Sequence, residues 1–228
     1  MKVKHLHPWN LDYEQARSVQ DRLSRRVLLR PISLRSIEFV AGADVAVSRR
    51  LDLLVASVVV MSFPGLELVE TRTAALRPAF PYVPGFLSFR ELPVLSLCLE
   101  NVHTPFQLLI CDGQGIAHPR HFGLASHAGL ALGAPSVGCA KSRLVGEHDE
   151  VGRQRGDYAK LTLKGQRVGS VLRTRDGVKP VYVSPGHLID HAGSRRITLA
   201  CLTRYRLPEP TRLAHIAAGK AKRSMETG

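Results

Sequence analysis

The chain has 228 residues and carries a formal net charge of +13, from 32 Lys and Arg against 19 Asp and Glu. Its composition, 44% hydrophobic and 22% charged, is that of an ordinary globular protein and excludes a largely disordered chain. We therefore expect one domain over residues 1–228, in which the basic C-terminal end could be flexible. The longest apolar run, residues 53–61, is far short of the roughly 20 residues that a membrane helix needs, and the N-terminus has no apolar signal core. This pattern predicts a cytoplasmic protein.

Hydrophobic patterning predicts an α/β fold. Taken in chain order, helices are expected over 10–30, 88–101, 123–132, 188–203 and 211–223. Strands are expected over 39–48, 53–63, 66–76, 106–111, 136–140, 168–174 and 179–184. Residues 77–87 form a loop rich in Pro and Gly, and the polar stretch 144–165 is expected to be a surface excursion. Three strands followed by alternating helices and strands predict a ribonuclease H-like mixed β-sheet flanked by helices.

Cysteine spacing argues against a redox or thiolate metal site. The four cysteines stand singly among apolar neighbours, and none forms a CxxC pair. This pattern predicts buried free thiols in a reducing compartment. The residues are Cys98, Cys111, Cys139 and Cys201.

The positive charge is concentrated at the two ends of the chain. Residues 1–40 hold 8 basic and 4 acidic side chains, residues 41–140 hold 6 and 7, and residues 141–228 hold 18 and 8. Clustered Lys and Arg neutralise phosphates well, so this distribution favours a polyanionic partner over a role in solubility alone. Among the basic residues near the C-terminal end, we expect Arg173 and Arg175 to contact phosphates.

Two aspartates mark a candidate metal site. Asp44 lies inside the apolar run GADVAV, and Asp112 follows the apolar run LLIC, with Gly113 directly after it. A carboxylate among apolar neighbours needs a partner, a metal ion or an opening into a cleft. Acids at the ends of neighbouring strands can converge on a hard cation such as Mg²⁺ or Mn²⁺. An Asp-Gly pair is also a common turn, so this alternative remains open for Asp112.

The loop before the second predicted helix allows two interpretations. Ser88 and Glu91 fit an S-x-x-E capping box, in which Glu91 only holds the start of a helix. The preceding PYVPGF segment places aromatic and apolar groups where a loop is usually polar, and two prolines stiffen it. Such a loop, tipped with Tyr82, resembles a wedge between stacked bases, although it could also pack against its own core.

The segment that follows Asp112 concentrates cationic and titratable groups. His118, Arg120 and His121 fall within four residues, where they could meet phosphates or a metal. Lys141 ends the apolar run PSVGCA, where it either extends to solvent or neutralises charge at a scissile phosphate. The chain has no GxxxxGK[ST] motif, so a P-loop nucleotide hydrolase is not supported.

Six motifs, taken in order, resemble the endonuclease V family of deoxyinosine-directed repair nucleases. They are GADVAV, PYVPGFLSFRELP, DGQGIAHPRHFGLASHAG, GCAKSRL, VSPGH and YRLPEPTRLAH, which together extend from about residue 40 to residue 217. The resemblance implies a ribonuclease H-like fold and a Mg²⁺-dependent hydrolase, for which Mn²⁺ substitutes. It implies cleavage of the second phosphodiester bond 3′ to a deaminated purine.

Carried over residue by residue, the resemblance implies roles for five candidate catalytic residues. Asp44 and Asp112 match the metal-binding aspartates, Glu91 the third active-site acid, and Lys141 the active-site lysine. His215 matches a position near the metal that is His in some members and Asp in others.

The resemblance also implies a set of substrate contacts. Tyr82 matches the wedge, His118 lies in the matching HPR segment, and the others match positions that enclose the flipped-out base. The set comprises Tyr82, Gly85, Leu87, Gly113, His118 and Leu124.

Our hypothesis is a monomeric DNA repair endonuclease that acts on deaminated purines in duplex or single-stranded DNA. Two alternatives stay open from the sequence. One is an endonuclease that acts on inosine-containing RNA, and the other is a non-catalytic basic module that only binds nucleic acid.

Overall fold

The elements of the fold follow the hydrophobic pattern of the chain. The computed structural model describes residues 1–227. The strands are β1 (Phe39–Ser48), β2 (Leu53–Ser62), β3 (Leu68–Leu76), β4 (Leu108–Cys111), β5 (Ser136–Ala140), β6 (Tyr158–Leu163), β7 (Gln166–Leu172) and β8 (Val181–His187). The helices are α1 (Tyr13–Ser24), α2 (Leu87–Glu100), α3 (Leu124–Leu132), α4 (His191–Ala200) and α5 (Glu209–Thr227), with a short 3-10 helix at Leu34–Ser36.

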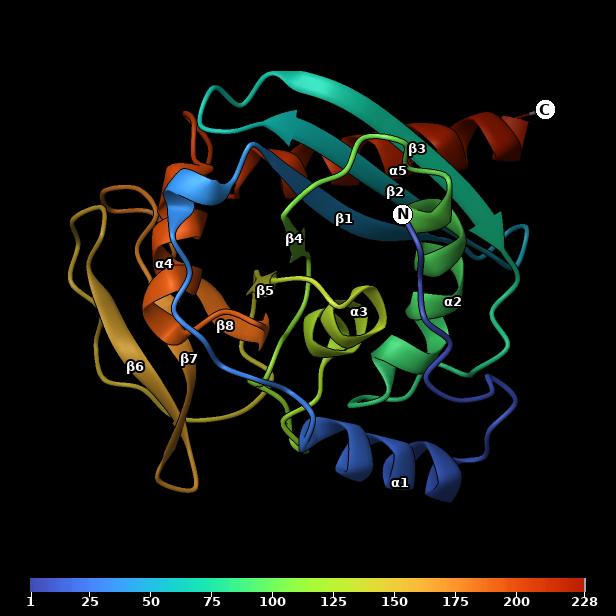
Figure 1. The fold of residues 1–228 in the computed structure, drawn as a ribbon, viewed down its shortest axis with the longest axis horizontal. Helices are drawn as coiled ribbons and strands as arrows, with labels where there is room; N and C mark the ends of the chain where they lie inside the picture. Colours follow the sequence, from blue (N-terminus) through green and yellow to red (C-terminus); the bar gives the residue numbers. More distant parts are fainter. Residues whose placement is uncertain (228) are drawn as a thin grey trace.

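All eight strands join in one mixed sheet (Figure 1). The spatial order is β3-β2-β1-β4-β5-β8-β7-β6. The first three strands form an antiparallel meander, β4 and β5 run parallel to β1, and β8 returns antiparallel beside β5. The predicted fold class, a ribonuclease H-like mixed sheet flanked by helices, is confirmed.

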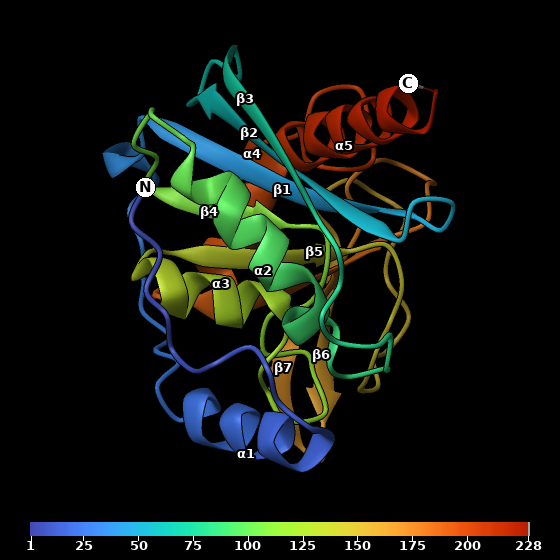
Figure 2. The ribbon, with the colours of Figure 1, turned by 90° about the vertical axis from the view of Figure 1, so that its right-hand side faces the viewer.

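Helices cover both faces of this sheet because its central strands are apolar on both sides. In β1, Ala41 and Ala43 face α2 and α3, whereas Val40 faces α4 and α5. The alternation continues in β4, where Leu109 packs on the first side and Ile110 on the second. Figure 2 shows α2 and α3 on one side of the sheet, α5 on the other, and α1 apart from both.

Helix α1 is shorter than the predicted helix over 10–30. It begins after Asp12, whose carboxylate accepts a hydrogen bond from the Gln15 backbone in a capping box, and it ends at Ser24. Beyond it the chain is extended, and the Leu28 carbonyl accepts a hydrogen bond from the Leu188 backbone N–H. The basic residues that suggested a long helix therefore belong partly to this extended segment.

The prediction that residues 144–165 form only a surface excursion was wrong. Their second half contains β6, whose side chains alternate between exposed and buried and which pairs with β7 at the edge of the sheet. Exposed Lys160 and half-exposed Tyr158 gave this strand a polar appearance, which is common for edge strands.

Arg173, which the sequence suggested as a phosphate contact, is tied to the protein's own backbone. Its guanidinium donates hydrogen bonds to the backbone carbonyls of Gly152, Val151 and Val178, so it joins two surface loops. Arg175, by contrast, is exposed.

Two further expectations can be compared with the structure. All four cysteines are buried and free, as predicted. Among residues 1–227, no helix is both long enough and apolar enough to cross a membrane.

Candidate active site

Strand pairing places Asp44 beside Asp112. In the parallel ladder of β1 and β4, Ala43 lies opposite Cys111, so the two aspartates that come next are neighbours. The Asp112 backbone N–H donates to the Ala43 carbonyl oxygen over 3.0 Å, which continues the ladder. Burial raises the pKa of Asp44, and the negative charge of Asp112 raises it further. The two carboxyls therefore share a partly desolvated pocket, and Asp112 is not merely a turn residue.

His215 reaches this pair from α5. Its Nδ1 lies 2.8 Å from Asp44 Oδ2, although the ring itself is largely exposed. The approach depends on Gly42, because a Cβ atom at this position would lie 2.1 Å from the backbone carbon of Pro210. The start of α5 thus lies against β1, close enough for His215 to reach Asp44.

Glu91 faces the same pair from α2. Burial raises the pKa of Glu91 to about 8, and the charges of Asp44 and Asp112 add to this shift. The capping-box interpretation was wrong: the helix begins at Leu87, and no side chain caps its start. Ser88 is buried within the first turn, and its hydroxyl has no hydrogen-bond partner among the described residues. Glu91 is the third acid of the cluster rather than part of a helix cap.

Lys141 supplies positive charge at the same place. It directly follows β5, the neighbour of β4, and its Nζ forms an ion pair with Asp112 Oδ2. Its side chain remains partly exposed, so the ammonium is within reach of a ligand that binds over the carboxylates.

The donor set fits a hard divalent cation. Asp44, Asp112 and His215 each offer one ligand atom, and these atoms lie within 4.8 Å of one another. Carboxylate oxygens with one imidazole nitrogen are ligands that Mg²⁺ and Mn²⁺ accept. Burial and, after it, the charge of Asp112 raise the pKa of Asp44, and a bound cation would offset both effects.

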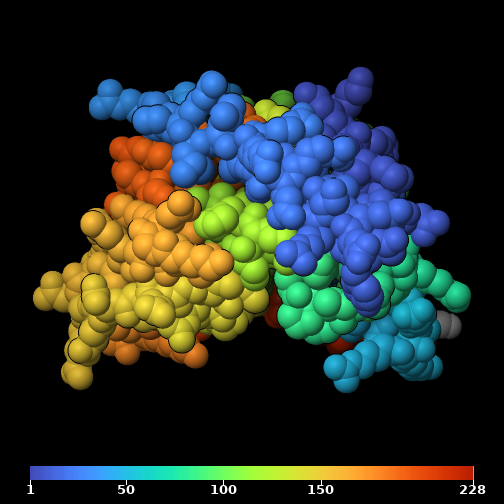
Figure 3. Space-filling view, turned by 90° about the horizontal axis from the view of Figure 1, so that it is seen from below, coloured from blue at the N-terminus to red at the C-terminus, as the bar shows by residue number. Residues whose placement is uncertain are grey.

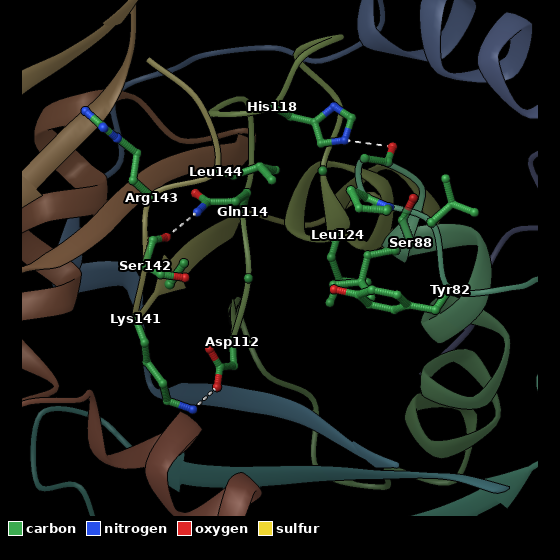
Figure 4. A pocket seen from close by; sticks show the side chains of 17 residues that line it. Tyr82, Ser88, Asp112, Gln114, His118, Leu124, Lys141, Ser142, Arg143 and Leu144 are labelled. Atoms are coloured by element: carbon green, nitrogen blue, oxygen red, sulfur yellow. Dashed lines mark hydrogen bonds and ion pairs between the residues drawn. The ribbon is translucent and has the colours of Figure 1, made fainter. Parts of the chain in front are cut away.

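A cavity of about 350 Å³ adjoins the carboxylates. Figure 3 shows the face on which the green segment near residue 85 and the yellow segment near residue 150 flank a hollow. In Figure 4, Asp112 and Lys141 lie at one end of the cavity and His118 at the other. The predicted substrate residues Tyr82, Gly85, Leu87, Gly113, His118 and Leu124 all line it.

The loop before α2 combines the two alternatives considered for it. Phe80 is buried and packs against Phe89, and Phe86 packs beside them, so the base of the loop belongs to the core. Tyr82 instead has 71% of its surface exposed and stands at the edge of the cavity. The packed aromatic rings anchor the loop, and the loop presents Tyr82 at the edge of the cavity.

The structure places His118 and Arg120 against the loop before α2, whereas the sequence suggested that they could meet phosphates or a metal. His118 is buried, and desolvation lowers the pKa of its ring to about 4, with the Arg120 charge adding to the effect. Its Nε2 donates to the Gly85 carbonyl over 3.0 Å, and Arg120 Nη2 donates to the same oxygen over 2.9 Å. Both side chains hold the loop in place.

Several cavity residues were missed from sequence. Gln114 donates a hydrogen bond to the Ser142 carbonyl, and Leu144 lies close by on the same wall (Figure 4). Leu144 is an exposed apolar residue at the start of a polar stretch, which was the available signal. Gln114 gave none, because a glutamine among glycines is uninformative without its partners.

A ribonuclease H-like sheet that brings acidic side chains together at its central strands, beside a cavity in a basic chain, defines the class of metal-dependent nucleases. The sequence profile of the endonuclease V family matches residues 21–216. The chain belongs to this family and is a nuclease, so the alternative of a non-catalytic module was wrong.

Individual relatives agree over nearly the whole chain. An endonuclease V of Rippkaea orientalis is 45% identical over 214 residues, which are 94% of this chain and 93% of that protein. The crystal structure of an endonuclease V of Streptomyces avermitilis is 40% identical, with a TM-score of 0.92 and coverage of 99% of this chain and 100% of that one. The endonuclease V of Ciona intestinalis is 26% identical, with a TM-score of 0.82 over 94% of this chain and 100% of that one. It has been solved with a 23mer DNA that contains an inosine followed by a ribo-adenosine.

Proposed function

We propose that the chain is a metal-dependent DNA endonuclease that recognises deoxyinosine and cleaves the second phosphodiester bond on its 3′ side. The proposal rests on the observation that the cavity adjoins the acidic cluster. Asp112 is one of the clustered carboxylates, and the next residue, Gly113, lines the cavity. A base held in the cavity would place its own strand over the carboxylates. The inosine-containing DNA bound by the Ciona intestinalis relative supports the same substrate.

The cavity residues would receive a base that has left the duplex. Enzymes that act on one base usually extrude it into a pocket, because its edge is hidden in the stack. Leu87 and Leu124 would enclose the apolar faces of the base, and the backbone at Gly85 and Gly113 would lie along its edge. Tyr82, exposed at the rim, would fill the space that the base leaves.

The carboxylates would bind Mg²⁺, for which Mn²⁺ would substitute. Asp44 and Asp112 would hold the ion, with His215 beside Asp44. When bound, such an ion supplies charge stabilisation and an activated water for phosphodiester hydrolysis. Glu91 would complete the acidic site, and the Lys141 ammonium would offset negative charge on the phosphate oxygens.

Cleavage of matched oligonucleotides tests this proposal. Strands that differ only in deoxyinosine or deoxyadenosine are incubated with Mg²⁺, with Mn²⁺ and with chelator. We expect a single nick at the second bond 3′ to deoxyinosine with either ion and none with chelator. Equal cutting of the deoxyadenosine strand, or cutting in chelator, would contradict the proposal.

Variants of the acids test which residues hold the ion. Asp44→Asn and Asp112→Asn keep the side-chain volume and remove the charge, so each should lower the single-turnover rate by at least about 100-fold while leaving the fold intact. Glu100→Gln, an exposed acid at the end of α2, is the matched control. Turnover near the wild-type rate in either aspartate variant would remove that residue from the metal site.

An inosine-containing RNA strand is the second candidate substrate. The ribo-adenosine after the inosine in the DNA bound by the Ciona intestinalis relative favours testing it. Faster single-turnover cleavage of the RNA than of the DNA strand would replace deoxyinosine by inosine in the proposal.

A further inference from the structure

One backbone carbonyl at the cavity collects three side-chain hydrogen bonds. The Gly85 oxygen accepts from Gln20 Nε2 over 2.9 Å, from His118 Nε2 over 3.0 Å and from Arg120 Nη2 over 2.9 Å. The N–H of the same peptide group, on Phe86, donates to the Val83 carbonyl over 3.0 Å. Both polar ends of this peptide are therefore held.

The held peptide lies where the PYVPGF segment, residues 81–86, which we call the wedge loop, meets α2. Gly85 is buried and has a φ of +80°, a conformation that favours glycine. It separates Tyr82 on one side from Leu87 on the other, and all three line the cavity. A rotation of this peptide would move the wedge relative to the cavity wall.

The His118 bond has a defined direction. The Arg120 backbone N–H donates to His118 Nδ1 over 3.2 Å, so Nδ1 acts as the acceptor. A neutral ring then carries its proton on Nε2, the atom that faces the Gly85 oxygen. His118 and Arg120 both come from the segment after β4, so two of the three donors are local to the cavity.

Gln20 brings the third donor from a distant part of the chain. It is fully buried on α1, whose other buried side chains are the apolar Ala16, Val19 and Leu23. Its Nε2 donates to Gly85, and its Oε1 accepts a hydrogen bond from Arg120 Nε. An apolar side chain at this position would be enough for the packing of α1. The amide of Gln20 in addition supplies hydrogen bonds to the Gly85 carbonyl and to Arg120.

We propose that Gln20 is a positioning residue for base recognition. It touches neither the base nor the reacting phosphate; it fixes the Gly85 peptide directly and aligns Arg120, which also donates to that peptide. Loss of its donor would loosen the wedge loop and the cavity wall together, while the carboxylates, held by β1 and β4, would stay in place. This inference rests on the proposed recognition of deoxyinosine.

Two substitutions separate the amide donor from packing. Gln20→Glu keeps the size of the side chain and the acceptor for Arg120 but removes the N–H donor. Gln20→Met keeps the volume and removes every hydrogen bond of the amide, including a longer one of 3.5 Å from Nε2 to the Phe122 carbonyl. Ser18→Ala, at an exposed position of the same helix, is the control.

The first measurement is the ratio of dissociation constants for a deoxyadenosine duplex and a matched deoxyinosine duplex. We expect both Gln20 variants to lower this preference by about tenfold, the scale of one hydrogen bond at a buried site. Affinity for the deoxyadenosine duplex and the single-turnover rate at saturating enzyme should stay within about twofold of wild type. An equal loss of affinity for both duplexes, or an unchanged preference for deoxyinosine in the Gln20→Glu variant, would overturn the positioning role of Gln20.

The second measurement is amide hydrogen exchange of residues 82–87 in the free protein, which needs no substrate. Exchange should become faster in both Gln20 variants and stay unchanged in Ser18→Ala. Unchanged exchange would overturn the positioning role whatever the substrate is. If wild type shows no preference for deoxyinosine, the proposed function fails along with this inference; a preference that the variants keep removes only the role of Gln20.

Discussion

Tyr82 combines exposure with a position at the edge of the cavity, and both properties fit a side chain that replaces a missing base. Tyr82→Ala should lose stacking worth roughly 1–3 kcal/mol, which corresponds to about 5- to 150-fold in affinity for a lesion in duplex DNA. Single-stranded deoxyinosine DNA should be affected less, because there is less stacking to disrupt. Binding of both substrates measures the difference.

Tyr82→Phe is the control for this prediction, since it keeps the ring and should behave almost like wild type. The Tyr82→Ala single-turnover rate at saturating enzyme should also fall less than that of Asp44→Asn, because the carboxylates are untouched. An equal loss of affinity for duplex and single-stranded DNA, or a Tyr82→Phe variant that binds as weakly as Tyr82→Ala, would argue for a specific contact by the phenol.

His118 makes the stability of the protein depend on pH. Its folded-state pKa of about 4 lies below its ordinary value of 6.5, so the unfolded chain takes up the proton first as the pH falls. The stability that the neutral ring contributes is therefore complete above pH 6.5 and is lost toward pH 4. His118→Gln, which cannot titrate, should gain about 2 kcal/mol relative to wild type between pH 7 and pH 5.

Urea unfolding of wild type and His118→Gln at the two pH values tests this prediction. Comparing the two proteins cancels the contributions of other titrating groups, including Glu91. Ser18→Ala, which changes no titratable group, should keep the same difference from wild type at both values. A His118→Gln difference that is also independent of pH would mean that folding does not lower the pKa of the His118 ring.

Among the elements, α5 depends on a single small residue of β1 for its position. A side chain at Gly42 would collide with the backbone of Pro210 and Thr211, and neither backbone can move without the helix. Gly42→Ala should therefore cost about 1–3 kcal/mol of stability and shift His215 away from Asp44. The free energy of unfolding measured in urea and the single-turnover rate should both decline.

Gly219→Ala, inside the same helix, is the matched comparison. There the nearest atom to an added Cβ is the guanidinium end of Arg223, which is flexible, at 3.4 Å. Alanine favours the helix over glycine by roughly 0.5–1 kcal/mol, so this variant should be more stable than wild type. A Gly42→Ala protein as stable as Gly219→Ala would show that α5 does not need the close approach.

At the scale of the whole molecule, the net charge of +13 predicts binding that weakens steeply with salt. Neutralising several phosphates releases counterions, so affinity for undamaged duplex should fall by at least about tenfold between roughly 50 and 200 mM salt. Arg175→Glu should weaken undamaged and lesion DNA by the same factor. A loss confined to lesion DNA would place Arg175 in base recognition instead.

The local sequence was sufficient for most of the elements and for the identity of the acids. Strands β1 and β5 have their predicted bounds, because uninterrupted apolar runs between turn residues leave few alternatives. Asp44 and Asp112 were recognisable as carboxylates within or next to such runs. The wedge loop was recognisable from aromatic residues between prolines.

Only the tertiary structure decided what depends on partners far along the chain. The end of α1 is set by pairing with the segment around Leu188, and β6 exists because β7 lies beside it. Glu91 fits a helix cap as well as an active-site acid until α2 is placed near β1 and β4. Gln20 lies 65 residues from the carbonyl that it holds, and no local pattern encodes that hydrogen bond. Hydrophobic periodicity shows which face of a helix or strand is buried, but it does not show which other element covers that face. These contacts arise from the packing of one element against another.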